Sequence, residues 1–292
     1  MQIIDGKKTA AEIREELKNK LNEIKATKER VPGLVTILVG EDPASSVYVN
    51  MKIKACAEIG MHSKLEKLDE SISEEELLQI IDNYNNDPLF HGILVQLPLP
   101  KHIDDDKVIE AINPNKDVDG FHPASVGKLV IGKDTFKSCT PFGILELLKR
   151  YNIETSGKHV VIIGRSNIVG KPMANMLVQK EDGANSVVTI CHSAAPDISL
   201  FTKQADILIA AVGRAHLVTK DMVKDGVVVI DVGMNRIDAP ETKKGYKLVG
   251  DVDFDEVSKK SSYITPVPGG VGPMTITMLM SNTFKAFENL EK

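Results

Sequence analysis

The sequence predicts an α/β protein made of two domains with a cleft between them. Segments with helical periodicity alternate with short apolar segments almost without a break along the 292 residues. These apolar segments are nearly continuous, which is typical of parallel strands covered on both faces. A turn-rich stretch over residues 113–138 interrupts the alternation and divides it into two series. The length suits two domains of roughly 150 residues each.

The first series lies before the turn-rich stretch. Amphipathic periodicity and apolar runs predict, in chain order, a helix over 7–26, a strand over 34–40, a helix over 45–60, a short strand over 63–69, a helix over 73–87 and a strand over 91–100. This order is a βαβ pattern, so we expect the strands to be parallel.

The second series follows the turn-rich stretch. The expected elements are a helix over 140–152, strands over 159–164, 186–192, 206–212 and 227–233, helices over 169–181, 197–205 and 219–226 between them, and a final helix over 272–290. No repeat, low-complexity tract or flexible linker separates the two series.

The composition excludes several classes of protein. A net charge of -5 and an isoelectric point near 5.9 argue against a nucleic-acid or membrane-surface binder, for which a basic face is expected. No apolar run approaches the ~20 residues of a membrane span, and the N-terminus has no apolar signal core. Cys56, Cys139 and Cys191 have no C-x-x-C spacing, so we expect no disulfide framework, no metal site and a reducing cytoplasm.

The stretch VVIIGRSNIVGKPMAN, residues 160–175, opens the second series with a strand and a glycine-containing turn. It lacks the G-x-G-x-x-G spacing of dinucleotide sites, because only Gly164 and Gly170 are present, with Ser166 between them. Gly164 nevertheless ends a strand, where parallel sheets bind ligands, and the N–H groups of the following helix can face a pyrophosphate. A purely structural turn stays an alternative.

The next strand favours NADP over NAD. It ends in His192 and Ser193, with no carboxylate for a ribose 2′-hydroxyl. Arg165 is placed to pair with a 2′-phosphate, and the Ser193 hydroxyl can donate a hydrogen bond to the same phosphate. For Arg165 alone, a solvated surface arginine is the alternative.

Polar residues in the first series are candidates for catalysis. Tyr48 and Lys52 are four residues apart and share a helix face, although such a pair also occurs at the edge of an ordinary apolar stripe. Gln96 ends a buried strand, where a polar side chain needs a partner, so we expect it in the cleft. A lysine desolvated beside a neutral amide can exchange protons near neutral pH.

Two further segments are candidates for ligand binding. Asp117 and Asp119 precede a glycine, and such acids usually cap a turn, yet a carboxylate also suits the paired N–H donors of a pterin-like ring. A metal site would need more oxygen ligands than this stretch supplies. The loop over 268–273 is rich in glycine and proline, so a flat ligand can approach its backbone closely.

The chain resembles the bifunctional methylenetetrahydrofolate dehydrogenase/cyclohydrolase family over essentially its whole length. The resemblance rests on a set of motifs in one order, namely YVNMK, VQLPLP, NKDVDGFHP, GRSNIVGKP, CHS and ITPVPGGVGPMT. It implies a catalytic folate domain over 1–139 and a Rossmann-like NADP domain over 140–272. It also implies a final helix, 273–292, that packs back on the first domain, and a homodimer formed through the nucleotide domain.

The resemblance also assigns roles to residues. It implies that Lys52 is catalytic, with Tyr48 against the folate and Gln96 tuning the lysine. Asp119 would anchor the pterin ring, and Pro268, Gly269 and Gly270 would wall the same pocket. The implied NADP contacts are Gly164, Arg165, Ser166, Ile168, Gly170 and Ser193. Two residues depart from the family pattern, Ser125 where Asn is common and Ser138 where Pro is common, which leaves the local loop geometry open.

The implied reaction has two steps and needs no metal. A hydride leaves the one-carbon bridge of 5,10-methylenetetrahydrofolate for NADP, and water then opens the methenyl product to 10-formyltetrahydrofolate with help from Lys52. Three alternatives stay open: a dehydrogenase without the hydrolase step, a shikimate-type dehydrogenase of similar architecture, and a noncatalytic NADP-sensing protein.

Overall fold

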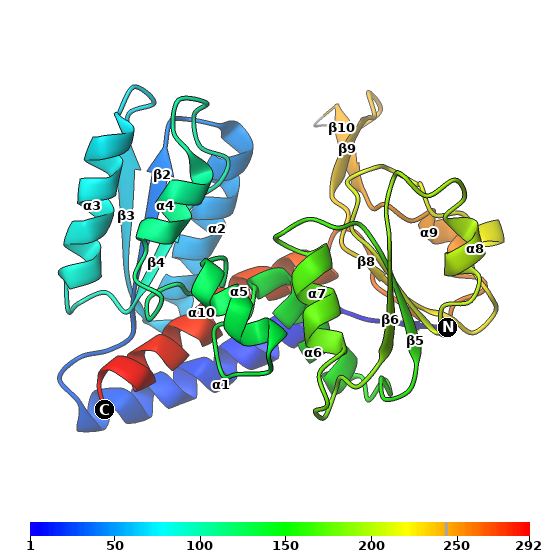
Figure 1. Cartoon of the computed structure of the whole chain (residues 1–292), viewed down its shortest axis with the longest axis horizontal. Helices are drawn as coiled ribbons and strands as arrows, with labels where there is room; N and C mark the ends of the chain where they lie inside the picture. The colour runs from blue at the N-terminus through cyan, green and yellow to red at the C-terminus, as the bar shows by residue number, and fades with distance from the viewer. Residues whose placement is uncertain (243–244) are drawn as a thin grey trace. The chain divides into compact units, whose positions relative to one another are not determined.

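The computed structural model describes residues 1–242 and 245–292, with Ala44 described without its side chain. The chain forms two compact units, each built from separated segments. The three-stranded unit contains Ala11–Cys139 and Ile276–Lys292, and the six-stranded unit contains Met1–Ala10 and Thr140–Thr275. Each has a parallel sheet with helices against it, so the predicted α/β class is confirmed (Figure 1).

The three-stranded unit has the strand order β3-β2-β4, all parallel. Its strands are β2 (Gly33–Val39), β3 (His62–Leu68) and β4 (Gly92–Val95), and its main helices are α2 (Pro43–Ile59), α3 (Glu74–Asn86), α4 (Asp105–Ala111) and α5 (Pro123–Val130). Every residue of β2 and β4 is buried, as expected for central strands covered on both faces. The apolar faces of α3 and α4 pack on one face of this sheet.

Local signals set the ends of these helices. The Asp42 carboxylate accepts the N–H of Ser45 at the start of α2, and Gly60 ends α2 in the left-handed conformation. Ser73 and Glu76 form a reciprocal capping box at the start of α3. These ends fix where each helix meets the sheet, and therefore where the residues at its carboxyl edge lie.

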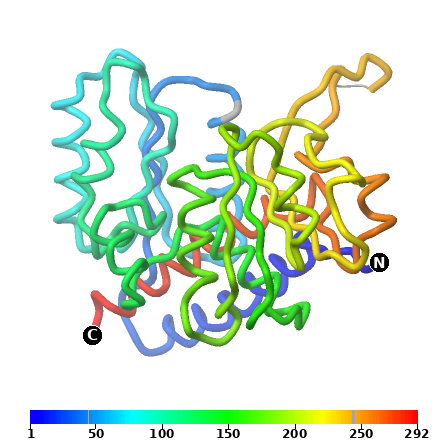
Figure 2. Tube along the Cα trace, turned by 45° about the vertical axis from the view of Figure 1, so that its right-hand side comes forward, coloured from blue at the N-terminus to red at the C-terminus, as the bar shows by residue number. Residues whose placement is uncertain are grey.

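The two longest helices, α1 (Gly6–Thr27) and α10 (Val271–Leu290), each contribute to both units. Within the three-stranded unit they lie side by side, as both Figure 1 and Figure 2 show. The Arg14 guanidinium donates to Thr277 Oγ1 at 3.1 Å, and Lys20 pairs with Glu288 at 2.6 Å. The chain's last helix is therefore a structural part of the unit that its first half begins.

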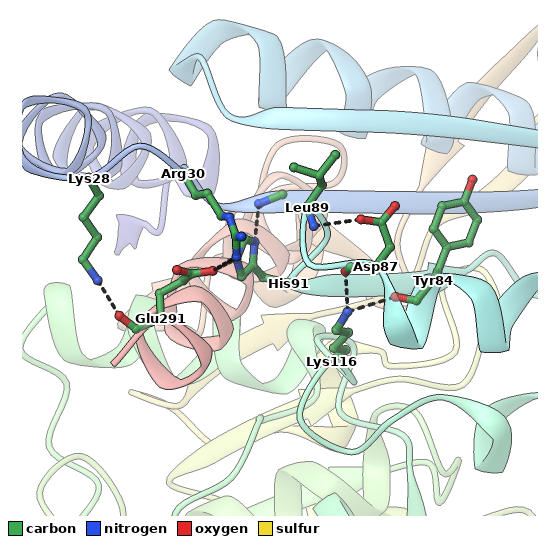
Figure 3. Close-up of polar contacts among 9 residues, drawn as sticks. Lys28, Arg30, Tyr84, Asp87, Leu89, His91, Lys116 and Glu291 are labelled. Atoms are coloured by element: carbon green, nitrogen blue, oxygen red, sulfur yellow. Dashed lines mark hydrogen bonds and ion pairs between the residues drawn. The ribbon is translucent and has the colours of Figure 1, made fainter.

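Two buried basic side chains organise the amino-terminal edge of the smaller sheet (Figure 3). Lys116 donates to two carbonyls at the end of α3, which completes that helix. His91 Nδ1 accepts the N–H of Gly33 at 3.1 Å, while its Nε2 lies 3.4 Å from the Glu291 carboxylate. Burial lowers the pKa of His91. The imidazole is therefore neutral, with its proton on Nε2 toward Glu291.

The six-stranded unit has the order β1-β11-β8-β7-β5-β6, and all its pairings are parallel. Its strands are β1 (Gln2–Ile3), β5 (His159–Ile163), β6 (Val187–Cys191), β7 (Ile207–Ala210), β8 (Val228–Asp231) and β11 (Tyr263–Ile264). The remaining elements are α6 (Cys139–Arg150), α7 (Gly170–Leu177), α8 (Ser199–Thr202), the 3₁₀ turn η1 (Lys220–Met222), α9 (Phe254–Val257) and the antiparallel ribbon of β9 (Asn235–Asp238) and β10 (Tyr246–Val249).

The structure differs from the expected elements mainly where elements are short. The helix expected over 219–226 is only the 3₁₀ turn η1. Helix α5 lies inside the stretch expected to be turns, because Pro123 stands in its first turn and His122 caps it. Residues 1–10, expected in the first domain, cluster with the six-stranded unit, since Gln2 and Ile3 pair with β11. A two-residue strand has no periodicity by which a sequence could reveal it.

Candidate active site

A cavity of about 520 Å³ opens at the carboxyl edge of β5, β6 and β7 in the six-stranded unit. Its lining includes Gly164, Arg165, Ser166 and Ser193, four of the six residues predicted to bind NADP. The other two do not line it: Gly170 is buried behind the turn, and the Ile168 side chain is 47% exposed. The position is that expected for a ligand of an open parallel sheet.

The turn after β5 requires glycine at two positions. Gly164 has a φ of 120°, and a Cβ atom on it would lie 2.2 Å from the Ala211 carbonyl oxygen. A Cβ atom on Gly170 would lie 2.2 Å from the Gly164 carbonyl oxygen. The Ser166 hydroxyl accepts the N–H of Val169 at 3.1 Å and so closes the turn. The backbone is thus compact and bare at Gly164, with the side chains of Arg165 and Ser166 following it in the cavity lining.

The charges in this cavity suit a phosphate-bearing ligand. Arg165 and Arg214, both exposed, contribute two guanidinium groups to the lining, and His192 and Ser193 follow β6 without an acid at that point. Asp197 also lines the cavity, but its carboxylate accepts from the backbone and hydroxyl of the residue two positions later. Arg214 was missed from the sequence, although its place just after an apolar strand was an available signal.

Two buried carboxylates hold the loop that carries Arg214. Asp251 accepts the N–H groups of Val212 at 2.7 Å, Gly213 at 3.0 Å and Arg214 at 2.9 Å. Asp231 in turn accepts the N–H of Asp251 at 2.9 Å, and burial raises the pKa of Asp231 to about 6. The cavity wall is therefore fixed by the sheet beneath it. This donor set and this bare turn fit a dinucleotide phosphate.

In the three-stranded unit, the side chains of Lys52 and Gln96 are joined by a hydrogen bond. Lys52 Nζ donates to Gln96 Oε1 at 2.8 Å, and Gln96 Nε2 donates to the Leu97 carbonyl oxygen at 2.7 Å. The second bond leaves the amide oxygen of Gln96 facing the lysine. The pair joins α2 to the carboxyl end of β4, as the expected elements implied.

Opposing effects act on the charge of Lys52. Burial lowers the pKa of Lys52, and the nearby Asp119 carboxylate partly raises it again. Burial raises the pKa of Asp119, which Lys52 and a hydrogen bond from the Cys139 thiol oppose. Tyr48 lies one turn before Lys52 on α2, and burial raises its pKa, so it stays a neutral phenol. The cluster can therefore hold and exchange a proton.

Cys139 is a member of this cluster that the sequence did not indicate. Its thiol interacts with both the Asp119 carboxylate and the Val118 carbonyl oxygen, and burial with the adjacent acid raises its pKa well above the usual value. All three cysteines are free and buried. The only available signal was the position of Cys139 at the end of the turn-rich stretch.

The two acids of the DVDG turn have different environments. Asp117 is 2% exposed and accepts the N–H groups of Gly120, Phe121 and His122 at 3.0 to 3.2 Å. Asp119, by contrast, is close enough to Lys52 that its carboxylate raises the pKa of the lysine, while Lys52 lowers the pKa of Asp119. Of the two uses that the sequence left open for this turn, Asp117 has the capping one.

Pro268, Gly269 and Gly270 lie in the six-stranded unit, on the loop between β11 and α10. The Gly269 carbonyl oxygen accepts the N–H of Lys7 at 2.9 Å. A Cβ atom on Gly270 would lie 2.6 Å from the Pro266 carbonyl oxygen, so this loop is tightly folded.

Within 1–242 and 245–292, no three His, Cys, Asp or Glu side chains gather in a way that could hold a metal ion. Across the same ranges, no helix has the length and apolar character to cross a membrane.

The fold and these two sets of residues define an α/β enzyme with an NAD(P)-binding sheet and a separate lysine-centred site. The family model for the tetrahydrofolate dehydrogenase/cyclohydrolase NAD(P)-binding domain matches residues 138–291, and the model for the catalytic domain of the same enzymes matches residues 4–119. The chain belongs to the tetrahydrofolate dehydrogenase/cyclohydrolase family.

Individual relatives are similar over their whole length. The bifunctional protein FolD of Chloroherpeton thalassium is 63% identical over 291 residues, 99% of each chain. The crystal structure of the bifunctional FolD enzyme of Campylobacter jejuni has a TM-score of 0.94 at 53% identity, covering 99% of each chain. The Trypanosoma brucei FolD structure, complexed with NADP and an inhibitor, has a TM-score of 0.92 at 39% identity, covering 98% of this chain and 97% of that one.

Proposed function

We propose that this enzyme oxidises 5,10-methylenetetrahydrofolate with NADP and hydrolyses the methenyl product to 10-formyltetrahydrofolate, using Lys52 for the second step. The observation that carries the proposal is the bond between Lys52 and Gln96 beside Asp119, in a chain that also holds the arginine-lined cavity. Family membership supports both activities and excludes the shikimate-type alternative. The three-stranded unit is the proposed folate domain, and the six-stranded unit is the proposed NADP domain.

In the first step, the chain's task is to bind and orient. NADP, when bound, accepts the hydride from the one-carbon bridge of the folate. Asp119 is proposed to accept the paired N–H donors of the pterin ring, and Tyr48 to pack against the ring system. Arg165 and Ser193 are proposed to hold the 2′-phosphate, with Gly164, Ser166, Ile168 and Gly170 shaping the turn.

In the second step, Lys52 manages protons. Water adds to the electrophilic methenyl carbon, and the bond from that carbon to the pterin-ring nitrogen breaks. Both protons of the water leave its oxygen, one to the freed ring nitrogen and one to solvent. Because burial lowers the pKa of Lys52, its neutral amine is more populated than that of an exposed lysine. Gln96 orients the amine without adding a charge that would raise this pKa. One folate site thereby serves both steps.

The decisive test is turnover by the intact protein. Methylenetetrahydrofolate and NADP should yield NADPH, methenyltetrahydrofolate and then 10-formyltetrahydrofolate, followed by absorbance. If methenyltetrahydrofolate accumulates and is hydrolysed no faster than without enzyme, the protein is a dehydrogenase without the hydrolase step. Binding of NADP without any turnover would indicate the noncatalytic alternative.

Arg165 is expected to select the cofactor. Arg165→Ala should weaken NADP binding far more than NAD binding, because a charge-assisted contact to phosphate contributes on the order of 1.5 to 3 kcal/mol. Calorimetric titration of both cofactors measures the difference, and Arg236→Ala, an arginine of the same unit outside the cavity lining, serves as the control. Equal losses for NADP and NAD would remove Arg165 from the 2′-phosphate site.

A homodimer through the six-stranded unit is also proposed. Strand β6 stands at one end of the sheet order, and its residues Val187 and Ile190 are 62% and 38% exposed. An apolar, unpaired edge strand is a ready site for pairing with a second copy.

The three free thiols and the acidic composition support a cytoplasmic location.

Charge on that edge should dissociate the dimer. Val187→Asp with Ile190→Asp should convert a dimer into a monomer in sedimentation velocity, because two carboxylates would have to be desolvated in the pairing. Val130→Asp, an equally exposed apolar position of the other unit, should leave the dimer intact. An unchanged sedimentation coefficient in the double variant would place the interface elsewhere.

A further inference from the structure

The turn that carries Asp119 is built around a second, buried carboxylate. Asp117 Oδ1 accepts the N–H groups of Gly120 at 3.1 Å and Phe121 at 3.2 Å, and Oδ2 accepts the N–H of His122 at 3.0 Å. The Ser125 hydroxyl, itself 2% exposed, donates to the same carboxylate from α5. One side chain thereby collects the backbone donors that follow Asp119.

The backbone on the other side of Asp119 is fixed independently. Asn282 on α10 donates its amide to the Val118 carbonyl oxygen at 2.8 Å and to the Lys137 carbonyl oxygen at 2.9 Å. Gly120 has a φ of 74°, and a Cβ atom on it would lie 2.8 Å from the Ser138 nitrogen, so the turn packs directly against that segment. The direction of the Asp119 side chain therefore depends on how this turn is held.

We propose that Asp117 is a positioning residue for folate binding: its carboxylate, held by the Ser125 hydroxyl, fixes the turn that presents Asp119 to the pterin ring. The inference rests on the proposed function, because it gives Asp119 the folate contact. Asp117 itself is enclosed by the backbone donors of the turn and by Ser125, so its effect on folate binding acts through Asp119.

The chemistry of the contact explains the need for a donor at position 125. Burial raises the pKa of Asp117 to about 6, and repulsion from Asp119 adds to this, whereas Ser125 and the backbone N–H groups lower it. These donors keep Asp117 ionised at neutral pH, and only the ionised form can accept from every donor in the turn. An asparagine amide at position 125 could donate in the same way as the Ser125 hydroxyl. The requirement is thus a hydrogen-bond donor of limited size.

The test compares three variants with a matched control. Ser125→Ala removes only the donor, Ser125→Asn replaces it with an amide, and Asp117→Asn removes the charge. Thr283→Val removes a buried hydroxyl from α10 of the same unit, where it donates to the Leu279 carbonyl oxygen at 2.8 Å. The measurements are KM and kcat for both folate reactions, KM for NADP, calorimetric titration with 5-formyltetrahydrofolate, and the melting temperature.

We expect Ser125→Ala to raise the folate KM of both reactions roughly fivefold, the scale of one buried hydrogen bond, and to weaken 5-formyltetrahydrofolate binding equally. The KM for NADP should stay unchanged, and kcat should change less than the folate KM. Ser125→Asn should restore folate KM toward the parent value. Asp117→Asn should have a larger effect of the same kind, and Thr283→Val should have none on folate KM.

The proposal would be overturned if the folate KM of Ser125→Ala equalled that of the parent protein. Equal losses for folate and NADP, or the same folate defect in Thr283→Val, would also overturn it, since either would indicate general destabilisation. If Asp117→Asn does not fold, the two Ser125 variants decide the question alone. Failure of the parent protein to turn over methylenetetrahydrofolate would instead contradict the proposed function, and titration of 5-formyltetrahydrofolate would still test the turn.

Discussion

Lys52→Met should lower the hydrolysis of methenyltetrahydrofolate by roughly 100-fold or more, the usual scale for losing acid–base assistance. Methionine keeps much of the volume of the lysine stem but removes the amine that Gln96 orients at 2.8 Å. Hydride transfer depends chiefly on alignment of folate and nicotinamide, so the dehydrogenase should retain measurable activity. Methenyltetrahydrofolate should therefore accumulate, and its absorbance measures the effect.

The pH profile distinguishes a lost proton carrier from a distorted site. Because burial lowers the pKa of Lys52, the neutral amine forms as pH rises through that lowered pKa, and parent cyclohydrolase activity should rise over the same range. Lys52→Met should lack this rise. Lys54→Met, an exposed lysine on the same helix, should keep both activities and the parent profile. Hydrolysis of added methenyltetrahydrofolate at the parent rate by Lys52→Met would assign the proton transfer to another group.

Asp119→Ala should weaken folate binding in both reactions by roughly 10- to 100-fold, because hydrogen bonds to a charged group contribute about 1.5 to 3 kcal/mol. NADP binding, measured by titration, should stay near the parent value. Loss of the carboxylate also removes the charge that raises the pKa of Lys52, so any residual cyclohydrolase activity should rise at a lower pH than in the parent.

The structure supplies a matched comparison for this prediction. Asp117 stands two residues away, but its carboxylate is enclosed by backbone donors, so Asp117→Asn should act through the turn and leave the charge near Lys52 in place. The cyclohydrolase pH profile should therefore shift more in Asp119→Ala, which removes that charge, than in Asp117→Asn, which keeps it. Full folate activity in Asp119→Ala would make the carboxylate a turn residue only.

The sequence predicted the main elements because their signals are local. The fully buried strand Gly33–Val39 reads as a continuous apolar run, and the helix after it starts at an aspartate and a proline and ends at Gly60. The bond from Lys52 to Gln96 follows from the parallel pairing of β4 with β2, because α2 begins after β2 and this pairing brings the carboxyl end of β4 beside that helix.

What the sequence could not predict depends on contacts between distant segments. The residues next to Asp117 and Asp119 do not show which carboxylate is surrounded by hydrogen-bond donors. The conformation of the turn and the hydroxyl of Ser125 place those donors around Asp117. Cys139 lies beside Asp119 although the two are twenty positions apart along the chain, with α5 between them. The strand Gln2–Ile3 exists only because Tyr263–Ile264 pairs with it. Such pairings leave no periodic pattern in the chain.

The discontinuity of the three-stranded unit has a consequence for synthesis on the ribosome. This unit needs Ile276–Lys292, which emerge long after Ala11–Cys139, to supply the Asn282 bonds and the contact between Glu291 and His91. The six-stranded unit is also discontinuous, because its strand β1 is synthesised long before β11, the strand with which it pairs. Neither unit can be completed until its last segment has been synthesised, up to Thr275 for the six-stranded unit and up to Lys292 for the three-stranded unit. A nascent chain stalled before residue 276 would expose the apolar surfaces that α10 covers, and would be a substrate for chaperones.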